Sequence, residues 1–333
     1  MAKLTRILVI GAGLIGIRHV DTVLDHKRCE LAGVVDPNPD LALPAGVKRF
    51  ASIAEVNVPV DGAIIATPTG LHAAHAQACA ERGWHLLIEK PVAGTPAEAD
   101  QIDASVTQHN VFCLVGHHRR YHPAVQKLRQ VVRDGEIGTP ITSSLIWAMR
   151  KPDAYFNTDW RRSGGSPVMI NLVHDIDLMR FVLGEITEMV ALGAHHQRNA
   201  GRVESGAAAL RFDSGLTATI SFADTTPSPW GFESAMGENP NIGSSGQDMW
   251  WITGTKGGVA FPSLTLWHSA PDWSQAPDYK NLQVNTVIPL YAQLDHFCDV
   301  IHRKQIPIID VADARKTLQA TCDLEELLAP APV

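Results

Sequence analysis

A lysine lies between a glutamate and a proline at Glu89-Lys90-Pro91, directly after the apolar run Trp84–Ile88. Such a run is typical of a buried strand, so the lysine would stand at the strand's carboxyl end. In open parallel sheets, ligands bind in the crevice beyond these ends. An ammonium group that is desolvated beside another positive charge can lose its proton and act as a base. We therefore predict that Lys90 is catalytic; the alternative is a surface lysine before a turn.

A second polar set lies in an otherwise apolar segment. Asn171, His174 and Asp177 recur at three-residue spacing, which places them on roughly one face of a helix. Polar groups on a buried helix need partners, so this face is a candidate for binding or catalysis. Because the chain has fifteen histidines, the alternative is a histidine with a purely structural role.

The elements that carry these residues indicate an α/β protein. Through residue 121 the chain alternates short apolar runs with helical segments, which predicts an N-terminal Rossmann domain with a doubly wound parallel sheet. The crossover at 37–46 is rich in proline and predicts an irregular loop. The expected strands are 6–10, 30–35, 62–66, 85–88 and 111–115, and the expected helices are 15–25, 71–82 and 96–109.

From residue 122 the pattern changes to alternating apolar and polar positions, which predicts a C-terminal α+β domain over 122–333 with a large, open, mostly antiparallel sheet. Residues 224–248 and 269–289 show no periodicity and stay unassigned. The expected strands are 141–149, 207–212, 216–222 and 250–253, and the expected helices are 122–134, 167–183, 290–303 and 311–328.

The glycine motif Gly11-Ala-Gly13-Leu14-Ile15-Gly16 follows the first strand and opens the first helix. In that context the motif predicts a dinucleotide site, with the phosphates at the helix N-terminus. Asp36, at the end of the second strand, is placed to accept hydrogen bonds from the adenosine ribose. No basic residue follows at positions 37–40, so NAD is favoured over NADP. Thr67 and Pro68, after the strand at 62–66, form either another cofactor contact or a plain loop.

Taken together and in order, five motifs resemble those of the glucose-fructose oxidoreductase, inositol dehydrogenase and MocA family. The resemblance implies a nicotinamide-dependent oxidoreductase that acts on CH–OH groups, with the second domain's open sheet used for substrate binding and for homodimer or homotetramer contacts. The five motifs are Gly11-x-Gly13-x-x-Gly16, Ala66-Thr-Pro-Thr-Gly-Leu-His72, Glu89-Lys90-Pro91, Gly116-His-His-Arg-Arg-Tyr121 and His174-Asp-Ile-Asp177.

The resemblance also implies residue roles. Lys90 would touch substrate and cofactor, often with a cis bond to the following proline, and His174 would transfer the proton of the reacting hydroxyl. Further cofactor contacts are expected within the motifs, at Gly11, Gly13, Leu14, Ile15, Gly16, Asp36, Thr67, Pro68, His72, Glu89 and His118.

One position departs from the family pattern. Many sugar and cyclitol members carry an aspartate four residues before the histidine, where this chain has Ile170. Asn171 is the nearest polar substitute and is a candidate catalytic residue, although an amide orients a hydroxyl without accepting its proton. Oxidation of a sugar, cyclitol or related polyol is therefore only one hypothesis.

The second hypothesis is a dehydrogenase for a carboxylated cyclic diol or a semialdehyde in aromatic catabolism, and the third is a nucleotide-binding sensor without catalysis. Aromatic rings suit stacking on a sugar or planar ring, and paired arginines suit a carboxylate. The substrate candidates on these grounds are Arg119, Trp160, Arg161, Asn171 and Trp230.

The composition limits the partners. A formal charge of −7 over 333 residues disfavours nucleic acid and membrane surfaces as partners. Five scattered cysteines predict neither a disulfide framework nor a zinc site, and we expect no metal. The low cysteine content and the lack of a signal sequence or an apolar span favour the cytoplasm.

Overall fold

The computed structural model describes residues 4–157, 166–194, 197–198, 202–239 and 241–329. Two compact units emerge from the packing: Met1–Tyr121 with Val287–Gln319, and His122–Thr286 with Ala320–Val333. The segment 287–319, which the sequence-based boundary placed in the second domain, packs with the first unit. No helix in the described ranges combines the length and hydropathy that crossing a membrane requires.

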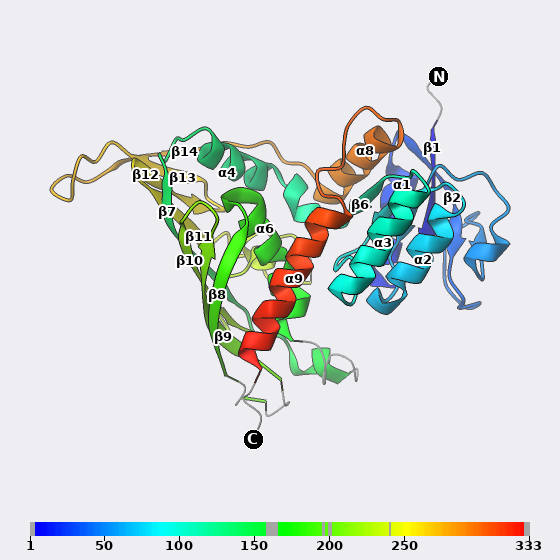
Figure 1. The fold of residues 1–333 in the computed structure, drawn as a ribbon, viewed down its shortest axis with the longest axis horizontal. Coiled ribbons are helices and arrows are strands. Elements are labelled where there is room, and N and C mark those ends of the chain that lie inside the picture. The colour runs from blue at the N-terminus through cyan, green and yellow to red at the C-terminus, as the bar shows by residue number, and fades with distance from the viewer. Residues whose placement is uncertain (1–3, 158–165, 195–196, 199–201, 240, 330–333) are drawn as a thin grey trace. The chain divides into compact units, whose positions relative to one another are not determined.

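The first unit contains a six-stranded parallel sheet in the order β3-β2-β1-β4-β5-β6. Figure 1 labels three of its strands, β1, β2 and β6. Its central strands are apolar and almost completely buried, as expected for a sheet that helices cover on both faces. This is the predicted Rossmann fold. The strands are β1 (Thr5–Ile10), β2 (Cys29–Val35), β3 (Arg49–Phe50), β4 (Gly62–Ile65), β5 (His85–Ile88) and β6 (Cys113–Val115).

Helices complete the first unit. Two features fix the start of α3 (Pro96–Gln108): a capping box formed by Thr95 and Glu98, and the proline in its first turn. No helix is present between β2 and β3, which agrees with the irregular crossover predicted at 37–46. The other helices are α1 (Leu14–Asp25), α2 (His72–Ala80), α8 (Pro289–Ile301) and the first part of α9 (Val311–Leu328).

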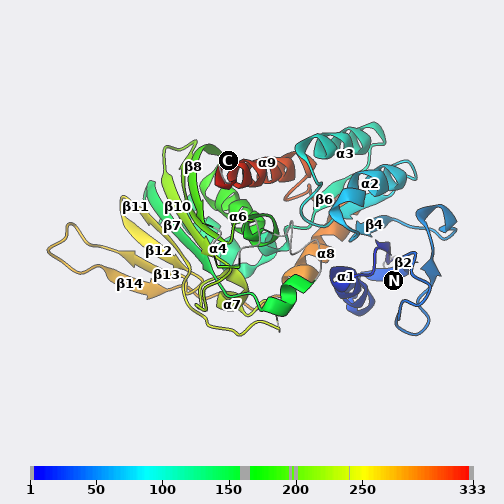
Figure 2. The ribbon, with the colours of Figure 1, turned by 90° about the horizontal axis from the view of Figure 1, so that it is seen from below.

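The second unit contains an eight-stranded sheet in the order β14-β13-β12-β11-β7-β10-β9-β8, antiparallel except between β7 and β10 (Figure 2). One face is buried, because covered and exposed residues alternate along the strands β9 and β10. The strands are β7 (Pro140–Ala148), β8 (Ile186–Ala194), β9 (Ser205–Phe212), β10 (Thr217–Ala223), β11 (Trp250–Gly254), β12 (Gly257–Phe261), β13 (Thr265–His268) and β14 (Asp278–Asn281).

The helices of the second unit include α4 (Pro123–Arg133), α6 (Val173–Leu183) and the short α7 (Phe232–Met236). A π-helical turn, Val168–Leu172, leads directly into α6. Such wide turns within helices are frequent at functional sites. Both α7 and β14 lie in the segments that the sequence left unassigned, 224–248 and 269–289 respectively.

Candidate active site

The carboxyl ends of four parallel strands bring the predicted nucleotide residues to one edge of the first sheet. The backbone N–H of Gly11 donates to Val35, that of Ala66 to Ile10, and that of Glu89 to Ile65, at 2.8, 2.8 and 2.9 Å. The residues that follow β1, β2, β4 and β5 are therefore neighbours. Gly11, Asp36, Thr67 and Lys90 belong to these four strand ends.

The three glycines of the motif are required for different reasons. Gly11 has φ +86°, and a Cβ at Gly16 would lie 2.0 Å from the carbonyl oxygen of Gly11, so both allow the tight turn and the close helix. A Cβ at Gly13 would have no atom of the described residues within 4 Å, apart from its chain neighbours. The space over the N-terminus of α1 is therefore open for a phosphate group, and the residues present fit an NAD molecule. Leu14, next to this space, is 85% exposed.

Asp36 is held in place by the glycine turn. Its Oδ2 accepts from the backbone N–H of Ala12 and its Oδ1 from that of Asn38, both at 2.9 Å. The side chain is only half buried, so lone pairs of both oxygens stay available to ribose hydroxyls. Arg49 donates to the carbonyl oxygen of Asp36 at 2.8 Å, which places a guanidinium group beside the same strand end.

We expect Asp36→Ala to weaken NADH binding about tenfold or more and to reduce the preference for NADH over NADPH, because the ribose acceptor is lost while Arg49 stays nearby. Fluorescence titration with both nucleotides measures the two effects. Asp40→Ala, in the exposed loop that follows, is the matched control. Unchanged affinity for both nucleotides would remove Asp36 from the ribose site.

The loop after β4 is tied to the loop after β5 by a buried histidine. His72 places Nε2 2.9 Å from the carbonyl oxygen of Thr67 and Nδ1 3.1 Å from that of Pro91. The Thr67 hydroxyl lies 3.1 Å from Nδ1 of His75. His72 therefore fixes the shape of this edge, while direct cofactor contact by His72, Thr67 or the exposed Pro68 stays a prediction.

Glu89 is buried and fixes the backbone at Lys90. Its Oε1 lies 2.8 Å from Nε2 of His19 on α1, and its Oε2 accepts from the backbone N–H of Lys90 at 3.1 Å. Burial raises the pKa of Glu89, but the hydrogen bond and charge of His19, with the charges of His118 and Lys90, outweigh burial and lower the pKa to about 2. Glu89 is therefore an anion that positions its neighbours.

Because the pKa of Glu89 is lower in the fold than in the unfolded chain, its ionised form stabilises the fold above pH 4.5, and this contribution declines as the pH falls toward 2. We expect Glu89→Gln to cost about 3 kcal/mol of unfolding free energy at neutral pH, and progressively less under acid conditions. Urea unfolding at several pH values measures this, with the exposed Glu30→Gln as control. A deficit that stayed constant with pH would contradict the assignment.

Lys90 is half exposed, and the Lys90–Pro91 peptide bond is cis, as the family resemblance implied. The motif at 116–121 forms a short 3-10 turn beyond β6 in which His118, Arg119 and Arg120 are buried. Arg120 donates to Asp313 at 2.6 Å and to the carbonyl oxygen of Ile308 at 3.2 Å, which gives it a structural role. Arg119 stays a predicted substrate contact, although it is only 2% exposed.

In the second unit, the predicted catalytic residues lie around the π turn. Asn171 is the fourth residue of this turn, and His174 is buried in the first turn of α6. Asp175 and Asp177 are also buried. Two of the predicted substrate residues, Trp160 and Arg161, lie outside the described residues. Trp230 is partly exposed, and its backbone carbonyl accepts from Ala148 at 2.6 Å.

A buried carboxylate that the sequence did not single out meets Asn171. Glu233 on α7 accepts from Nδ2 of Asn171 and from Nε1 of Trp147, each at 3.1 Å. Oδ1 of Asn171 is buried and has no hydrogen-bond partner among the described residues. Glu233 lies in the unassigned segment 224–248, where the only signal was a carboxylate within the apolar stretch from Trp230 to Met236.

Two family models cover most of the chain. The oxidoreductase family with an NAD-binding Rossmann fold matches residues 5–117, and the GFO/IDH/MocA C-terminal domain matches residues 125–260. The chain belongs to the Gfo/Idh/MocA oxidoreductase family. The cofactor of its first unit is accordingly NAD. That the glycine turn and Asp36 hold it stays a prediction.

Curated relatives of this family member have diverse substrates. It is 26% identical to scyllo-inositol 2-dehydrogenase (NAD(+)) of Bacillus subtilis over 96% of this chain and 92% of that protein. It is 24% identical to 4-carboxy-2-hydroxymuconate-6-semialdehyde dehydrogenase of Sphingobium, over 68% of this chain and 74% of that protein. The uncharacterized oxidoreductase YrbE of Bacillus subtilis is 28% identical, and the match spans 64% of this chain and 65% of YrbE.

A solved structure shares the fold over its whole length. The WlbA dehydrogenase from Bordetella pertussis, in complex with NADH and UDP-GlcNAcA, matches with a TM-score of 0.79 at 20% identity, and the match covers 100% of this chain and 99% of WlbA.

Proposed function

We propose that the protein is an NAD-dependent dehydrogenase that moves a hydride between nicotinamide and a CH–OH carbon of a sugar, cyclitol or related polyol. The observation that carries this proposal is the position of Lys90 at the carboxyl end of β5, on the same edge of the sheet as the open glycine turn after β1 and Asp36 after β2. The bound NAD supplies the hydride acceptor. The inositol dehydrogenase similarity supports a polyol substrate.

We assign the handling of the hydroxyl proton to Lys90 and His174, since general-base help and positioning both lower the barrier. Glu89 holds the Lys90 backbone through its 3.1 Å hydrogen bond. Asn171 orients a substrate hydroxyl through its amide, and Glu233 fixes that amide by accepting from Nδ2, which leaves Oδ1 as the acceptor for the substrate.

The test is a substrate panel measured as NADH formation, with inositols, neutral sugars and carboxylated diols. Turnover of any member at a rate that depends on NAD supports the proposal, and its pattern separates a polyol from a carboxylated substrate. NADH binding without turnover of any member, at several pH values, would favour the nucleotide-binding sensor.

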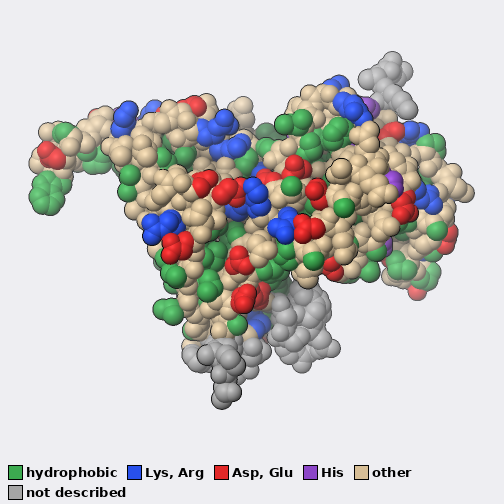
Figure 3. Space-filling view, in the orientation of Figure 1, with side chains coloured by type: hydrophobic (Ala, Val, Ile, Leu, Met, Phe, Trp, Pro, Cys, Tyr) green, Lys and Arg blue, Asp and Glu red, His purple; other side chains and the backbone are tan. Residues whose placement is uncertain are grey.

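We further propose that copies of the chain associate as a homodimer or homotetramer through the eight-stranded sheet. The support is the outer part of this sheet, where Val190 and Leu192 on β8 are 60% and 81% exposed. Figure 3 shows hydrophobic side chains on this part of the second unit. Light scattering compares the molecular mass of Leu192→Asp with that of the parent chain, since a charge in this face would dissociate the oligomer.

We also propose that the protein is located in the cytoplasm.

A further inference from the structure

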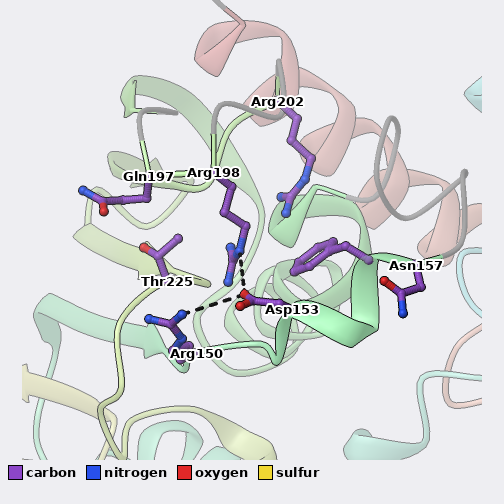
Figure 4. Close-up of a pocket in the computed structure, with 8 residues that line it drawn as sticks. Arg150, Asp153, Asn157, Gln197, Arg198, Arg202 and Thr225 are labelled. Carbon is purple, nitrogen blue, oxygen red and sulfur yellow. Dashed lines mark ion pairs between the residues drawn. The ribbon is translucent and has the colours of Figure 1, made fainter.

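The second unit contains a polar pocket of about 670 Å³. A volume of this size is typical of sites for small molecules. Three arginines, Arg150, Arg198 and Arg202, line it together with Asp153, Phe156 and Thr225 (Figure 4). The concentration of guanidinium groups is unexpected in a chain whose net charge is −7.

Two of these arginines are fixed by a carboxylate that has no contact with solvent. Asp224 is 0% exposed; its Oδ1 lies 2.6 Å from Nη1 of Arg198, and its Oδ2 lies 3.1 Å from Nη2 of Arg202. Both guanidinium groups also stack on the ring of Phe156, at 4.7 and 4.6 Å from its centroid. One carboxylate between two guanidinium groups leaves a net positive charge, on side chains that are already ordered.

One N–H donor of this arrangement, Nε of Arg202, is available to a ligand. Arg202 is only 6% exposed, and its Nε is buried without a hydrogen-bond partner among the described residues. A buried donor of a charged group without an acceptor is costly, and such donors are usually satisfied by a ligand or water.

The third arginine, Arg150, lies on the other side of the Asp153 carboxylate from Arg198. Arg150 and Arg198 lie 3.8 and 3.9 Å from Oδ1 of Asp153, beyond hydrogen-bond length, and both point toward it in Figure 4. Asp153 is 79% exposed. A ligand carboxylate or phosphate that hydrogen-bonds both guanidinium groups would make the shorter contacts that Asp153 does not make.

A buried lysine extends the positive charge behind the pocket. Lys151 is 9% exposed, its Nζ has no hydrogen-bond partner among the described residues, and burial lowers its pKa to about 8. Its Nζ lies 5.6 Å from the ring of Trp147 and 5.2 Å from that of Tyr155. Two further buried carboxylates lie in this region: Glu204 accepts backbone N–H bonds from Gln197 and Arg198, and Glu233 accepts from Trp147.

A series of contacts connects the pocket to Asn171. Arg198 donates to the carbonyl oxygen of Lys151 at 3.1 Å, and Nζ of Lys151 lies over Trp147. Trp147 donates to Glu233, which accepts from Asn171. The wall of the pocket and the residues around the π turn therefore belong to one packed network within the second unit.

We propose that this pocket binds an anionic group, a carboxylate or a phosphate, carried by the molecule whose hydroxyl is oxidised. Arg150 and Arg198 would donate hydrogen bonds to the anion from their guanidinium groups. Arg202 would donate through Nε, and Thr225 through its hydroxyl. The substrate class is thereby narrowed to a polyol or sugar with a negatively charged group. That the ligand is the substrate rests on the proposed function; that an anion binds does not.

Binding is therefore measured without turnover, by calorimetric titration of the full chain saturated with NADH. The probes are galacturonate and L-tartrate as carboxylates, glucose 6-phosphate as phosphate, and galactose and glucose as neutral partners. We expect at least one anionic probe to bind about tenfold or more tightly than its neutral partner, with an affinity that falls as salt rises. Whichever anion type binds more tightly shows whether the pocket recognises a carboxylate or a phosphate.

Two variants with opposite effects test the site. Arg150→Gln, at a side chain that is 55% exposed and has only the loose ion pair, is expected to weaken anion binding about tenfold. Asp153→Asn is expected to strengthen it severalfold, because it removes the competing carboxylate. Arg211→Gln, an exposed arginine on β9 paired with Glu188, is the control that removes the same charge elsewhere.

Equal affinity for anionic and neutral probes would overturn the proposal, as would anion binding that Arg150→Gln and Arg211→Gln change alike. Anion binding with both shifts in the expected directions supports it, even if no tested molecule is oxidised. If the anion binds as expected but no tested molecule is oxidised, the anion site is supported and the proposed function is contradicted.

Discussion

Replacing Lys90 by alanine is expected to lower kcat by a factor of at least ~100, the usual contribution of a positioned acid or base, while the Kd for NADH changes by less than about threefold. The reason is its place at the carboxyl end of β5, with a backbone that Glu89 and the fixed loop hold in position. We expect the phosphate and ribose contacts at other strand ends, and we therefore expect cofactor binding not to depend on this ammonium group.

The measurement combines steady-state turnover with NADH fluorescence titration on the same preparation. Lys27→Ala, an exposed lysine of the same unit, is the matched control. A Lys90→Ala variant with the turnover of the parent chain would exclude Lys90 as a base. A large loss of NADH affinity would instead make it a cofactor anchor.

Replacing His174 by glutamine is expected to lower kcat about 100-fold or more and to abolish the decline of kcat toward acid pH, because glutamine fills the space but exchanges no proton. His174 is buried in the first turn of α6, directly after the π turn that carries Asn171. Its burial makes the imidazole well positioned and shields it from solvent.

The pH profile separates this role from a structural one. A variant that is merely less well folded would lose turnover at every pH in the same proportion, and its thermal unfolding would shift. His268→Gln, a half-exposed histidine of the same unit, is the control. An unchanged pH profile in His174→Gln would assign the proton transfer elsewhere.

The first sheet could be predicted from sequence because its strands are short, fully apolar runs between helices. β4 and β5 are almost completely buried, so burial and pattern agree. The two-residue strand β3 was not predicted, because Arg49 and Phe50 are too few to show a period. The glycine motif and Asp36 were recognisable because their spacing follows from the turn between a strand and a helix.

The edge strands β14 and β8 and the inner strand β12 of the second sheet were not predicted, each for a physical reason. All four residues of β14 are exposed and mostly polar, so no alternation marks it. β8 exposes apolar residues such as Leu192, which inverts the usual pattern. β12 begins with two glycines, which are typical of turns, yet Gly257 stands where any Cβ would meet the carbonyl oxygen of Trp267.

The sequence motifs propose some residues of the candidate site and not others. Lys90 and His174 were proposed from their motifs, and their roles stay predictions. Glu233 was not singled out, because its helix α7 has only five residues and is flanked by Gly231 and Gly237. Its importance is visible only in space, where Trp147 and Asn171 converge on it. The arginines of the pocket were missed as a group because they are separated in sequence: Arg150 follows β7, whereas Arg198 and Arg202 lie between β8 and β9. Asp224, directly after β10, pairs with Arg198 and Arg202.

The open space over Gly13 distinguishes a glycine that only cofactor binding requires from the two glycines that the fold itself requires. Gly11 and Gly16 are held by the chain's own atoms, so a change at either is selected against even in a descendant that no longer uses a nucleotide. At Gly13, by contrast, an added Cβ would contact none of the described residues beyond its chain neighbours. A descendant that kept the outer glycines and replaced the middle one would be a stable fold that had given up its cofactor. Position 13 is therefore where a lineage of this protein would first record the loss of redox chemistry.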